Sequence, residues 1–308
     1  MKRREFLRTT SAVCAGMAIA KAMPMLADTA TANGCWTFEV QARVEVLKPE
    51  GVTHIWLPAA LIRDTPYQKT LSNKFAAEGG AANLTKNEED ALGIVSATYP
   101  AGAKPVLTLT SVVSTKNYEV DLLKPAAKHT ASQAELAYFL QPSQYVPVDG
   151  IVLETATKAT SGATTDEEKA RALYEWVVLN TFRDPKVRGC GRGDIRFMLE
   201  SGDMGGKCAD INALYVGLAR AVGIPARHVY GLRIAKSEQG YKSLGLATDR
   251  ATKGQHCRAE IYLKDYGWVP VDPADVRKVA LEEPPGNLSV NDQGPWPRRA
   301  SNSSASGR

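Results

Sequence analysis

The sequence of 308 residues lacks several features that would each define a class of protein. It has no phosphate-binding loop and no dinucleotide fingerprint between a strand and a helix, so it implies no nucleotide, flavin or metal cofactor. It has no Cys-x-x-Cys pair, which argues against a structural zinc site. Beyond its first residues, no apolar run is long enough to span a membrane. The chemistry of the chain is therefore expected to come from its own side chains.

The N-terminal segment, MKRREFLRTTSAVCAGMAIA, combines a basic start with a short apolar run, which is typical of a targeting leader. The paired Arg3 and Arg4, followed by x-Phe-Leu, resemble a twin-arginine signal. An A-x-A cleavage site follows at residues 30–32, with Ala27 as an earlier alternative. We therefore expect residues 1–32 to be a signal peptide and the mature protein to be soluble in the periplasm.

Removing the leader changes the charge and the cysteine content of the chain. The formal net charge is +5, of which the leader carries +3, so the mature protein would carry +2. A nearly neutral protein lacks a strongly basic surface, and we expect no nucleic-acid partner. Cys14 would be lost with the leader, leaving Cys35, Cys190, Cys208 and Cys257, and their spacing leaves any disulfide pairing open.

Short strands are predicted in the first half of the mature chain. Apolar and polar residues alternate in CWTFEVQARVEV, GVTHIWLPAA and AKPVLTLTSVVST, which are separated by turn-rich stretches such as EGGAANLTKNEED. This pattern predicts an antiparallel β-sandwich-like domain over residues 35–147. His54 and His129 have no acidic or thiol neighbour, so we expect ordinary surface or structural roles for them.

The pattern becomes helical after LQPSQYVPVDG, a candidate linker. Thr165 and Glu168 match a capping box before apolar residues at helical spacing, which predicts a helix over residues 166–180. A second domain is expected over residues 150–283. Residues 284–308 are rich in Ser, Pro, Gly and Asn without an apolar period, which predicts a disordered tail.

A cysteine stands near the start of the apolar stretch GGKCADINALYVGLARAVGIP. The pattern predicts a helix buried on all sides, ended by Gly223 and Pro225. Cys208 would then lie in the first turn, where unpaired N–H groups and the helix dipole lower a thiol pKa and could hold an oxyanion. Gly205 and Gly206 would leave room for a substrate backbone. On this segment alone, a small core cysteine is an equal alternative.

The segment HCRAEIYLKDYGWVPVDPADV is predicted to form two strands joined by a turn. Alternation places His256 on a face that lines a cleft and Cys257 on the buried face. In the second strand, Asp272 lies on the face that the apolar valines do not occupy. Contact between His256 and Asp272 requires the turn to lie near Lys264, or a bulge. The pattern predicts a thiol nucleophile, a general base and an orienting carboxylate.

The Gly-Lys-Cys-Ala-Asp helix start, the GIPARHVYG that follows, and the later H-x-x-x-E with GWVPVDP resemble the transglutaminase-like superfamily. The resemblance covers about residues 165–280. It implies an α+β fold with a papain-like, transglutaminase-type catalytic domain preceded by a β-rich domain. It also implies that Cys208, His256 and Asp272 form a catalytic triad. In that family the His is often followed by a small and then an aromatic residue, whereas here it is followed by Cys257 and Arg258. In addition, no Trp or Gln upstream of Cys208 can be identified as a second oxyanion donor.

Two alternatives concern the other cysteines. Cys190, in the loop RDPKVRGCGRGD, could line the cleft, gate it or bind an acidic group, but an exposed loop cysteine or half of a disulfide would also explain it. A zinc site formed by Cys190, Cys208, His256 and Cys257 is disfavoured, because adjacent strand residues point to opposite faces.

Three polar strand residues are left outside the predicted site. His228 shares a strand face with apolar residues, which predicts a core histidine with satisfied hydrogen bonds. Arg258 and Glu260 share the face of His256, where they could contact substrate or each other, or simply lie on a solvated face.

Taken together, these patterns predict an exported enzyme that transfers an acyl group from an amide or peptide bond. Its substrate would be a protein or peptide, with a cell-wall peptide as one candidate. Water as acceptor would make it a peptidase or amidase, and an amine would make it a transglutaminase. No cofactor is expected. The alternative is a non-catalytic binding or scaffold protein of the same fold.

Overall fold

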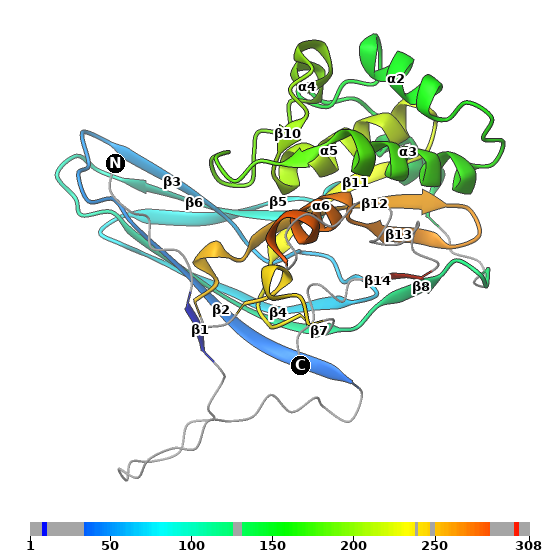
Figure 1. Cartoon of the computed structure of the whole chain (residues 1–308). Helices are drawn as coiled ribbons and strands as arrows, with labels where there is room; N and C mark the ends of the chain where they lie inside the picture. Colours follow the sequence, from blue (N-terminus) through cyan, green and yellow to red (C-terminus); the bar gives the residue numbers. More distant parts are fainter. Residues whose placement is uncertain are drawn as a thin grey trace. The chain divides into compact units, whose positions relative to one another are not determined.

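The computed structural model describes residues 8–10, 34–125, 131–237, 240–246, 250–283 and 299–301 (Figure 1). These residues form two compact units, and each is described by itself. The first extends to Tyr118 and includes Leu246 and residues 250–254, and the second contains the other described residues. The twin-arginine motif, both predicted cleavage sites and His129 lie outside the described residues.

The first unit contains two antiparallel sheets (Figure 1). The order in one is β1-β2-β7-β4, formed by β1 (Arg8–Thr10), β2 (Cys35–Glu45), β7 (Val106–Lys116) and β4 (Gln68–Glu78). The order in the other is β3-β6-β5, formed by β3 (Thr53–Pro58), β6 (Leu92–Tyr99) and β5 (Ala81–Asn87), and η2 (Ala251–Lys253) is a short 3-10 turn. Tyr99 is fully buried, and its hydroxyl donates to the Val106 carbonyl at 2.7 Å. This hydrogen bond links the second sheet to the first.

The alternating pattern identified β2, β3 and β7, whereas β4, β5 and β6 were not among the predicted strands. Trp36, Phe38 and Ala42 of β2 are buried, as a period of two predicts. The stretch EGGAANLTKNEED, predicted to form a turn, instead contains β5. The prediction was wrong because β5 is an edge strand on which only Ala82 and Leu84 are partly covered, so its apolar period is weak.

The second unit combines helices with an antiparallel sheet, so the chain has the predicted α+β class (Figure 1). Its helices are α1 (Gln133–Tyr138), α2 (Ile151–Ala159), α3 (Asp166–Asn180), α4 (Ile195–Ser201), α5 (Cys208–Ala221) and α6 (Pro273–Glu282), with a 3-10 turn at η1 (Lys242–Leu244). The main sheet has the order β11-β12-β13, formed by β11 (Ala226–Leu232), β12 (Gln255–Leu263) and β13 (Gly267–Val271). Two pairs of short strands complete the unit: β9 (Phe182–Arg183) with β10 (Gly205–Gly206), and β8 (Glu119–Asp121) with β14 (Arg299–Ser301).

Helices α3 and α5 have the bounds that their end signals predict. The Thr165 hydroxyl accepts from the Glu168 N–H at 3.1 Å, and the Glu168 carboxylate accepts from the Thr165 N–H at 3.0 Å, completing the capping box. Every residue from Cys208 to Ala219 is buried, and Gly223 follows the helix with a φ of +87°. Helix α5 packs on β12 and against α2 and α3. None of the described helices has the length and apolar character needed to cross a membrane.

The second unit begins at Glu119, earlier than the boundary near residue 150 predicted from the pattern. Its early segments bond to the later ones, since the Phe139 carbonyl accepts from the Ala226 N–H at 3.1 Å. The stretch LQPSQYVPVDG, proposed as a linker, is also tied into this unit, because the Tyr145 carbonyl accepts from the Ile195 N–H at 3.1 Å. A Pro-rich composition therefore marked irregular backbone here and not a link between units.

Short strands also lie within the predicted leader and tail. Residues 8–10 pair with β2, and residues 299–301 pair with β8. Residues 299–301 thus form a short strand within the segment predicted to be a disordered tail. Backbone hydrogen bonding in an antiparallel pair requires no apolar period, so composition could not reveal this pairing.

Candidate active site

Cys208 is the first residue of α5, and its exposed fraction is 6%. The two glycines before it lie against neighbouring side chains. A Cβ on Gly205 would lie 2.5 Å from Phe182 Cζ, and one on Gly206 would lie 2.5 Å from Asp210 Cβ. The glycines therefore permit the close approach of β10 to its surroundings, whereas the sequence suggested that they leave space for a substrate.

A buried carboxylate fixes the loop that precedes α4 against the start of α5. Asp210 Oδ1 accepts from the N–H groups of Arg192 and Gly193, each at 2.8 Å. Its Oδ2 accepts from the Lys207 N–H at 2.9 Å. These three hydrogen bonds use both carboxylate oxygens, so the charge of Asp210 is compensated by backbone dipoles. The role of Asp210 was not predicted from the sequence.

The loop fixed by Asp210 brings Cys190 to the start of α5. The Cys190 carbonyl accepts from the Ala209 N–H at 2.8 Å, and the Cys190 thiol lies 3.7 Å from the Gln255 carbonyl oxygen. Cys190 is partly exposed, and the four described cysteines are all free thiols. Of the alternatives drawn from the sequence, a cysteine that lines the site agrees with this position. The Ala209 N–H, one of the first-turn amides expected to be free for an oxyanion, is occupied.

Three side chains lower the pKa of the Cys208 thiol: Cys190, Cys257 and His256. The two thiols contribute most to lowering the pKa of Cys208, burial opposes them, and the hydrogen bond and charge of His256 lower it further. Donation to the Cys208 anion is also the main reason why the pKa of Cys190 and that of Cys257 are raised. Of these three cysteines, Cys208 is therefore the one whose thiolate form is favoured.

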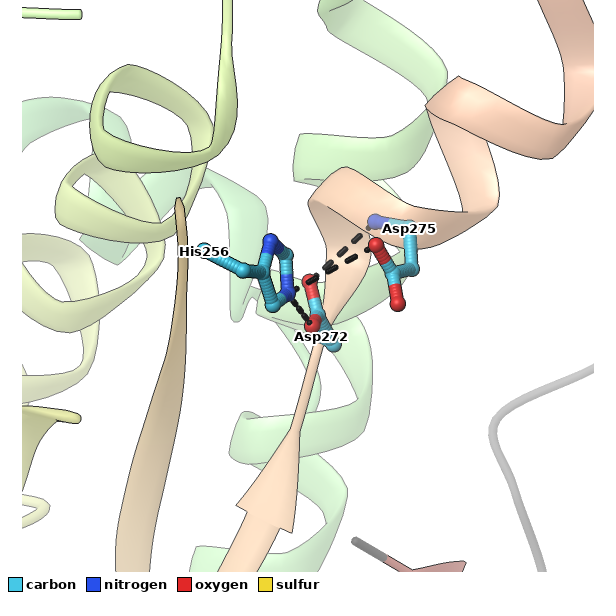
Figure 2. Close-up of side chains that lie close together, drawn as sticks. All are labelled: His256, Asp272 and Asp275. Atoms are coloured by element: carbon cyan, nitrogen blue, oxygen red, sulfur yellow. Dashed lines mark hydrogen bonds and ion pairs between the residues drawn. The ribbon is translucent and has the colours of Figure 1, made fainter. Parts of the chain in front are cut away.

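The imidazole of His256 lies beside two carboxylates, those of Asp272 and Asp275 (Figure 2). Its Nε2 is 2.6 Å from Asp272 Oδ2 and 3.6 Å from Asp275 Oδ1. Because Nε2 is taken by Asp272, Nδ1 is the ring nitrogen left for Cys208. Burial alone would lower the pKa of His256, but the charges of Asp272 and Asp275 outweigh it and raise this pKa to about 9. The geometry favours a thiolate–imidazolium pair.

The hairpin register explains why His256 meets Asp272. Glu260 pairs with Pro270 and Leu263 with Gly267, so the turn occupies residues 264–266, near Lys264 as the predicted contact requires. The same register continued by one pair places Asp272 level with residue 258, two positions from His256 on the same strand face. The predicted contact between the two side chains is confirmed.

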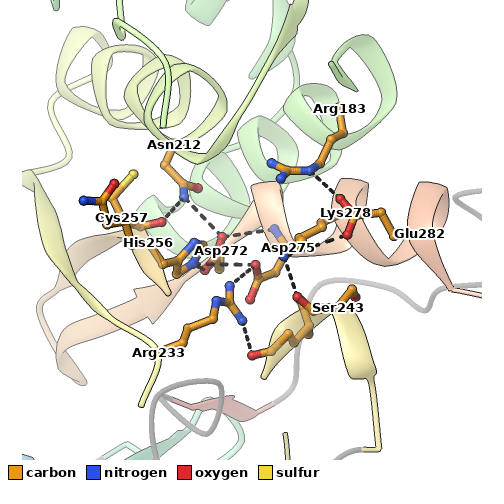
Figure 3. Close-up of polar contacts among 12 residues, drawn as sticks. Arg183, Asn212, Arg233, Ser243, His256, Cys257, Asp272, Asp275, Lys278 and Glu282 are labelled. Carbon is orange, nitrogen blue, oxygen red and sulfur yellow. Dashed lines mark hydrogen bonds and ion pairs between the residues drawn. The ribbon is translucent and has the colours of Figure 1, made fainter. Parts of the chain in front are cut away.

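A hydrogen-bond network extends behind this contact (Figure 3). Asn212 is fully buried, and its Nδ2 donates to Asp272 Oδ1 at 3.1 Å and to the Cys257 carbonyl at 2.7 Å. Asp272 also caps α6, since Oδ1 accepts from the Asp275 N–H at 3.1 Å. Arg233 forms a buried ion pair with Asp275. The network holds the Asp272 carboxylate in one orientation.

The sequence contained a signal for two members of this network that the analysis did not use. Asn212 lies four residues after Cys208, which places both on one face of α5. Asp275 lies three residues after Asp272, which is the spacing from an N-cap to the amide that it caps. Arg233 follows the end of β11 and had no comparable signal.

Arg258 and Glu260 form part of the interior, so the suggestion of a solvated face is wrong. Glu260 is 1% exposed, and its carboxylate lies 2.8 Å from Arg227 and 3.0 Å from Arg258. Arg227 also stacks over the Trp268 ring, with 4.0 Å between Cζ and the ring centroid. Strand β12 is central in its sheet, and these ion pairs allow its polar residues to be buried. Contact between Arg258 and Glu260, one of the alternatives, is observed.

His228 lies on β11 and has no role in the site. Its Nε2 is buried and finds no hydrogen-bond partner among the described residues, so the expectation of a fully satisfied histidine is wrong. Burial, together with the charge of Arg220, lowers its pKa to about 4. The ring therefore stays neutral near pH 7, and an uncharged imidazole can be buried without an ion pair.

One cluster of possible metal ligands occurs in the described part of the chain. It consists of His256, Asp272 and Asp275, whose ligand atoms all lie within 4.8 Å of one another. Hydrogen bonds within the cluster and the ion pair from Arg233 to Asp275 already explain this arrangement. The absence of a metal or cofactor from the function stays a prediction.

Comparisons with known proteins relate this geometry to a family. Residues 154–273, which include all three predicted triad residues, match the transglutaminase-like superfamily. A protein of Haemophilus influenzae described as uncharacterized is 36% identical over 249 residues, which span 76% of this chain and 67% of that protein. The chain belongs to the transglutaminase-like superfamily.

Solved structures similar to this transglutaminase-like protein include the following two. A candidate cysteine protease from Cytophaga hutchinsonii has a TM-score of 0.58 and 18% identity, over 86% of this chain and 87% of that one. The periplasmic domain of TgpA from Pseudomonas aeruginosa has a TM-score of 0.43 and 16% identity, over 80% and 71% of the two chains. The similarity to the Cytophaga hutchinsonii protein covers much more of the chain than residues 154–273, which match the family. It agrees with the predicted papain-like α+β fold.

Proposed function

We propose that this transglutaminase-like protein is an enzyme that uses Cys208 to transfer an acyl group from an amide or peptide bond. The observation that carries the proposal is the 2.6 Å contact between His256 Nε2 and Asp272 Oδ2, and it is supported by the effect of His256 on Cys208, the first residue of α5, whose pKa it lowers. In this assignment Cys208 is the nucleophile, His256 exchanges the proton, and Asp272 orients the ring.

The reaction begins with attack of the Cys208 thiolate on the carbonyl carbon. The C=O electron pair moves onto oxygen as the S–C bond forms, and the developing negative charge requires a nearby N–H donor. The described residues provide no intramolecular acceptor for the Cys208 N–H, which suits it to this task, whereas the Ala209 N–H is bonded to Cys190. The C–N bond then breaks as imidazolium gives its proton to the leaving amine.

The thioester left on Cys208 is resolved by a second nucleophile. Water or a primary amine attacks the thioester carbonyl and loses a proton to His256, and the S–C bond breaks to restore the thiolate. Water gives hydrolysis of a protein or peptide, and an amine gives a new amide bond. Both outcomes belong to the proposal, because the same three residues serve both acceptors.

Labelling of Cys208 with iodoacetamide across the pH range tests the proposal. Trypsin releases Cys208 in a peptide of its own, residues 208–220, so its modification can be measured separately from that of the other cysteines. We expect rapid labelling well below neutral pH and loss of this reactivity in His256→Ala, with His54→Ala as the control. Labelling with the pH dependence of an ordinary thiol in the unmodified protein would support a non-catalytic scaffold instead.

A glutamine peptide, incubated with and without a primary amine, identifies the acceptor. Conversion of glutamine to glutamate indicates hydrolysis, and incorporation of the amine indicates transfer. Cys208→Ala is expected to abolish either product. Release of neither product from the glutamine peptide, or from a panel of unmodified peptides, would contradict the enzymatic proposal.

Export to the periplasm is part of the same proposal. It is supported by the paired arginines and the A-x-A site of the N-terminal segment. Replacing Arg3 and Arg4 together by Lys is expected to leave an uncleaved precursor in the cytoplasmic fraction. Unchanged processing and location in that variant would exclude the twin-arginine route.

A further inference from the structure

Two free cysteines lie close together at the proposed active site. The Cys190 thiol influences the pKa of Cys208, and both cysteines are free. Their backbones are also adjacent, because the Cys190 carbonyl accepts from the N–H of Ala209, the residue after Cys208. A disulfide requires neighbouring backbones, which this hydrogen bond provides, and side-chain rotations that bring the sulfur atoms about 2.05 Å apart.

Cys257 also influences the pKa of Cys208, but it lies in the interior. It is fully buried on the central strand β12, and the Asn212 side chain holds its carbonyl at 2.7 Å. Cys190 lies outside the helices and strands, partly exposed, between Gly189 with a φ of +63° and Gly191 with a φ of +101°. Of these three cysteines, Cys190 is therefore the one that can be reached from solvent.

We propose that Cys190 is the resolving thiol of a reversible oxidation that switches off Cys208. This inference rests on the proposed function and concerns the regulation of the same site. The oxidant is a peroxide. The Cys208 thiolate attacks one peroxide oxygen, the O–O bond breaks, and Cys208 becomes a sulfenic acid as the other oxygen leaves as water or an alcohol.

Closure of the disulfide follows from the sulfenic acid. The Cys190 sulfur attacks the Cys208 sulfur, the S–O bond breaks, and the departing hydroxide takes a proton and leaves as water. With hydrogen peroxide, two thiols and one peroxide give one disulfide and two waters. A thiol reductant restores both thiols, and the nucleophile is unavailable while the disulfide exists.

Charges around Cys190 suit the order of these steps. The pKa of Cys190 is raised first by its hydrogen bond to Cys208, then by burial and by the charge of that anion. Oxidation converts the Cys208 anion into a neutral sulfenic acid and so removes two of these three causes. The charges of Lys207 and Arg183, which lower the pKa of Cys190, remain. Cys190 is therefore a donor in the reduced site and becomes a better nucleophile once Cys208 is oxidised.

Peptide mapping of the full chain tests the linkage without any measurement of activity. Trypsin cleavage places Cys190 in residues 189–192, Cys208 in residues 208–220 and Cys257 in residues 254–258. After hydrogen peroxide and alkylation of the remaining thiols, we expect 189–192 joined to 208–220, two hydrogens lighter than the sum of the peptides. A link from 208–220 to 254–258, or sulfinic acid on 208–220 without any link, would overturn the assignment.

Two matched variants complete the test. In Cys190→Ser, compared at equal loss of free Cys208, we expect the sulfinic and sulfonic forms to accumulate and dithiothreitol to restore no free thiol at residue 208. Cys35→Ser removes a thiol of the other unit and should keep the wild-type recovery. Full recovery in Cys190→Ser would exclude Cys190 as the resolving thiol. A protein that forms the linkage but cleaves no amide would contradict the proposed function alone.

Discussion

The side-chain amide of Asn212 donates a hydrogen bond of 3.1 Å to the Asp272 carboxylate. Asn212 stands one helical turn after Cys208, so α5 supplies both the thiol and a group that orients the carboxylate behind His256. Helix α5 and the β12–β13 hairpin are thereby coupled through a side chain that does not itself need to touch a substrate.

Replacing Asn212 by Ala is expected to lower kcat while leaving KM nearly unchanged, because Asp272 loses a positioning donor. A misplaced catalytic group costs on the order of tenfold to a hundredfold in rate. Loss of a buried hydrogen bond should also lower the free energy of unfolding by about 1–3 kcal/mol. Steady-state kinetics with the amide substrate checks the first effect, and Asn180→Ala, on exposed α3 surface, is the control. An equal change in kcat for both variants would contradict this role.

Gly191→Ala is expected to displace the loop that carries Cys190. A Cβ at this position would lie 1.9 Å from Asp210 Oδ2, and its φ of +101° disfavours a side chain. We expect slower iodoacetamide labelling of Cys208, because one thiol donor is moved away from it. Gly189→Ala is the matched control: its φ is +63° and nothing lies within 4 Å, so about 1 kcal/mol of stability is the expected cost. Equal labelling rates for the two variants would argue against the loop's contribution.

Asp275→Asn is expected to shift the basic limb of the rate profile to lower pH. The imidazolium of His256 must give its proton to the leaving amine, so the rate should fall as pH rises through about 9. The charge of Asp275 is one of the causes that raise this pKa, after that of Asp272, and its removal brings the pKa of His256 back toward 6.5. The pH dependence of kcat measures the shift, with the exposed Asp149→Asn as control. An unmoved limb would show that Asp275 does not influence His256.

The free energy of unfolding should also depend on pH through His256. Its folded pKa of about 9 exceeds the ordinary value of 6.5, so the folded state binds the proton more tightly than the unfolded state. This contribution is fully present below pH 6.5 and is lost as pH rises through about 9. Urea unfolding at several pH values should show the decrease in the unmodified protein and a smaller one in His256→Gln. Parallel curves would contradict the raised pKa.

Glu260→Ala is expected to lower the free energy of unfolding by about 3–5 kcal/mol, because it leaves the charges of Arg227 and Arg258 without their buried partner. The exposed pair formed by Arg43 and Glu45 provides the comparison. Glu45→Ala should change stability by no more than about 1 kcal/mol. Urea denaturation of both variants checks the difference, which would vanish if Glu260 were solvated.

Local rules predicted the parts of the site that depend on neighbours in the sequence. The end signals around Cys208 located α5, and alternation with a constraint on the turn brought His256 to Asp272. Contacts between distant segments had no such signal. Cys190 reaches Cys208 only because Asp210 binds the intervening loop, and this requires a buried carboxylate to receive three backbone N–H groups.

Buried polar residues were the main source of error for the same reason. Glu260 has the alternation of an exposed strand position, yet it is interior because arginines from its own strand and from β11 pair with it. Edge strand β5 was missed for the opposite reason. Few of its side chains are buried, so its sequence shows little alternation of apolar and polar residues. Sequence spacing predicts which face a side chain lies on, and the tertiary partners decide whether that face is covered.

The turn at residues 264–266 has a consequence for how this hairpin can change over time. Its amino acids can be exchanged wherever the backbone tolerates them, but one inserted or deleted residue would slide one strand past the other and carry Asp272 out of reach of His256. Length at this turn is therefore under tighter constraint than composition, although no side chain of the loop belongs to the proposed chemistry.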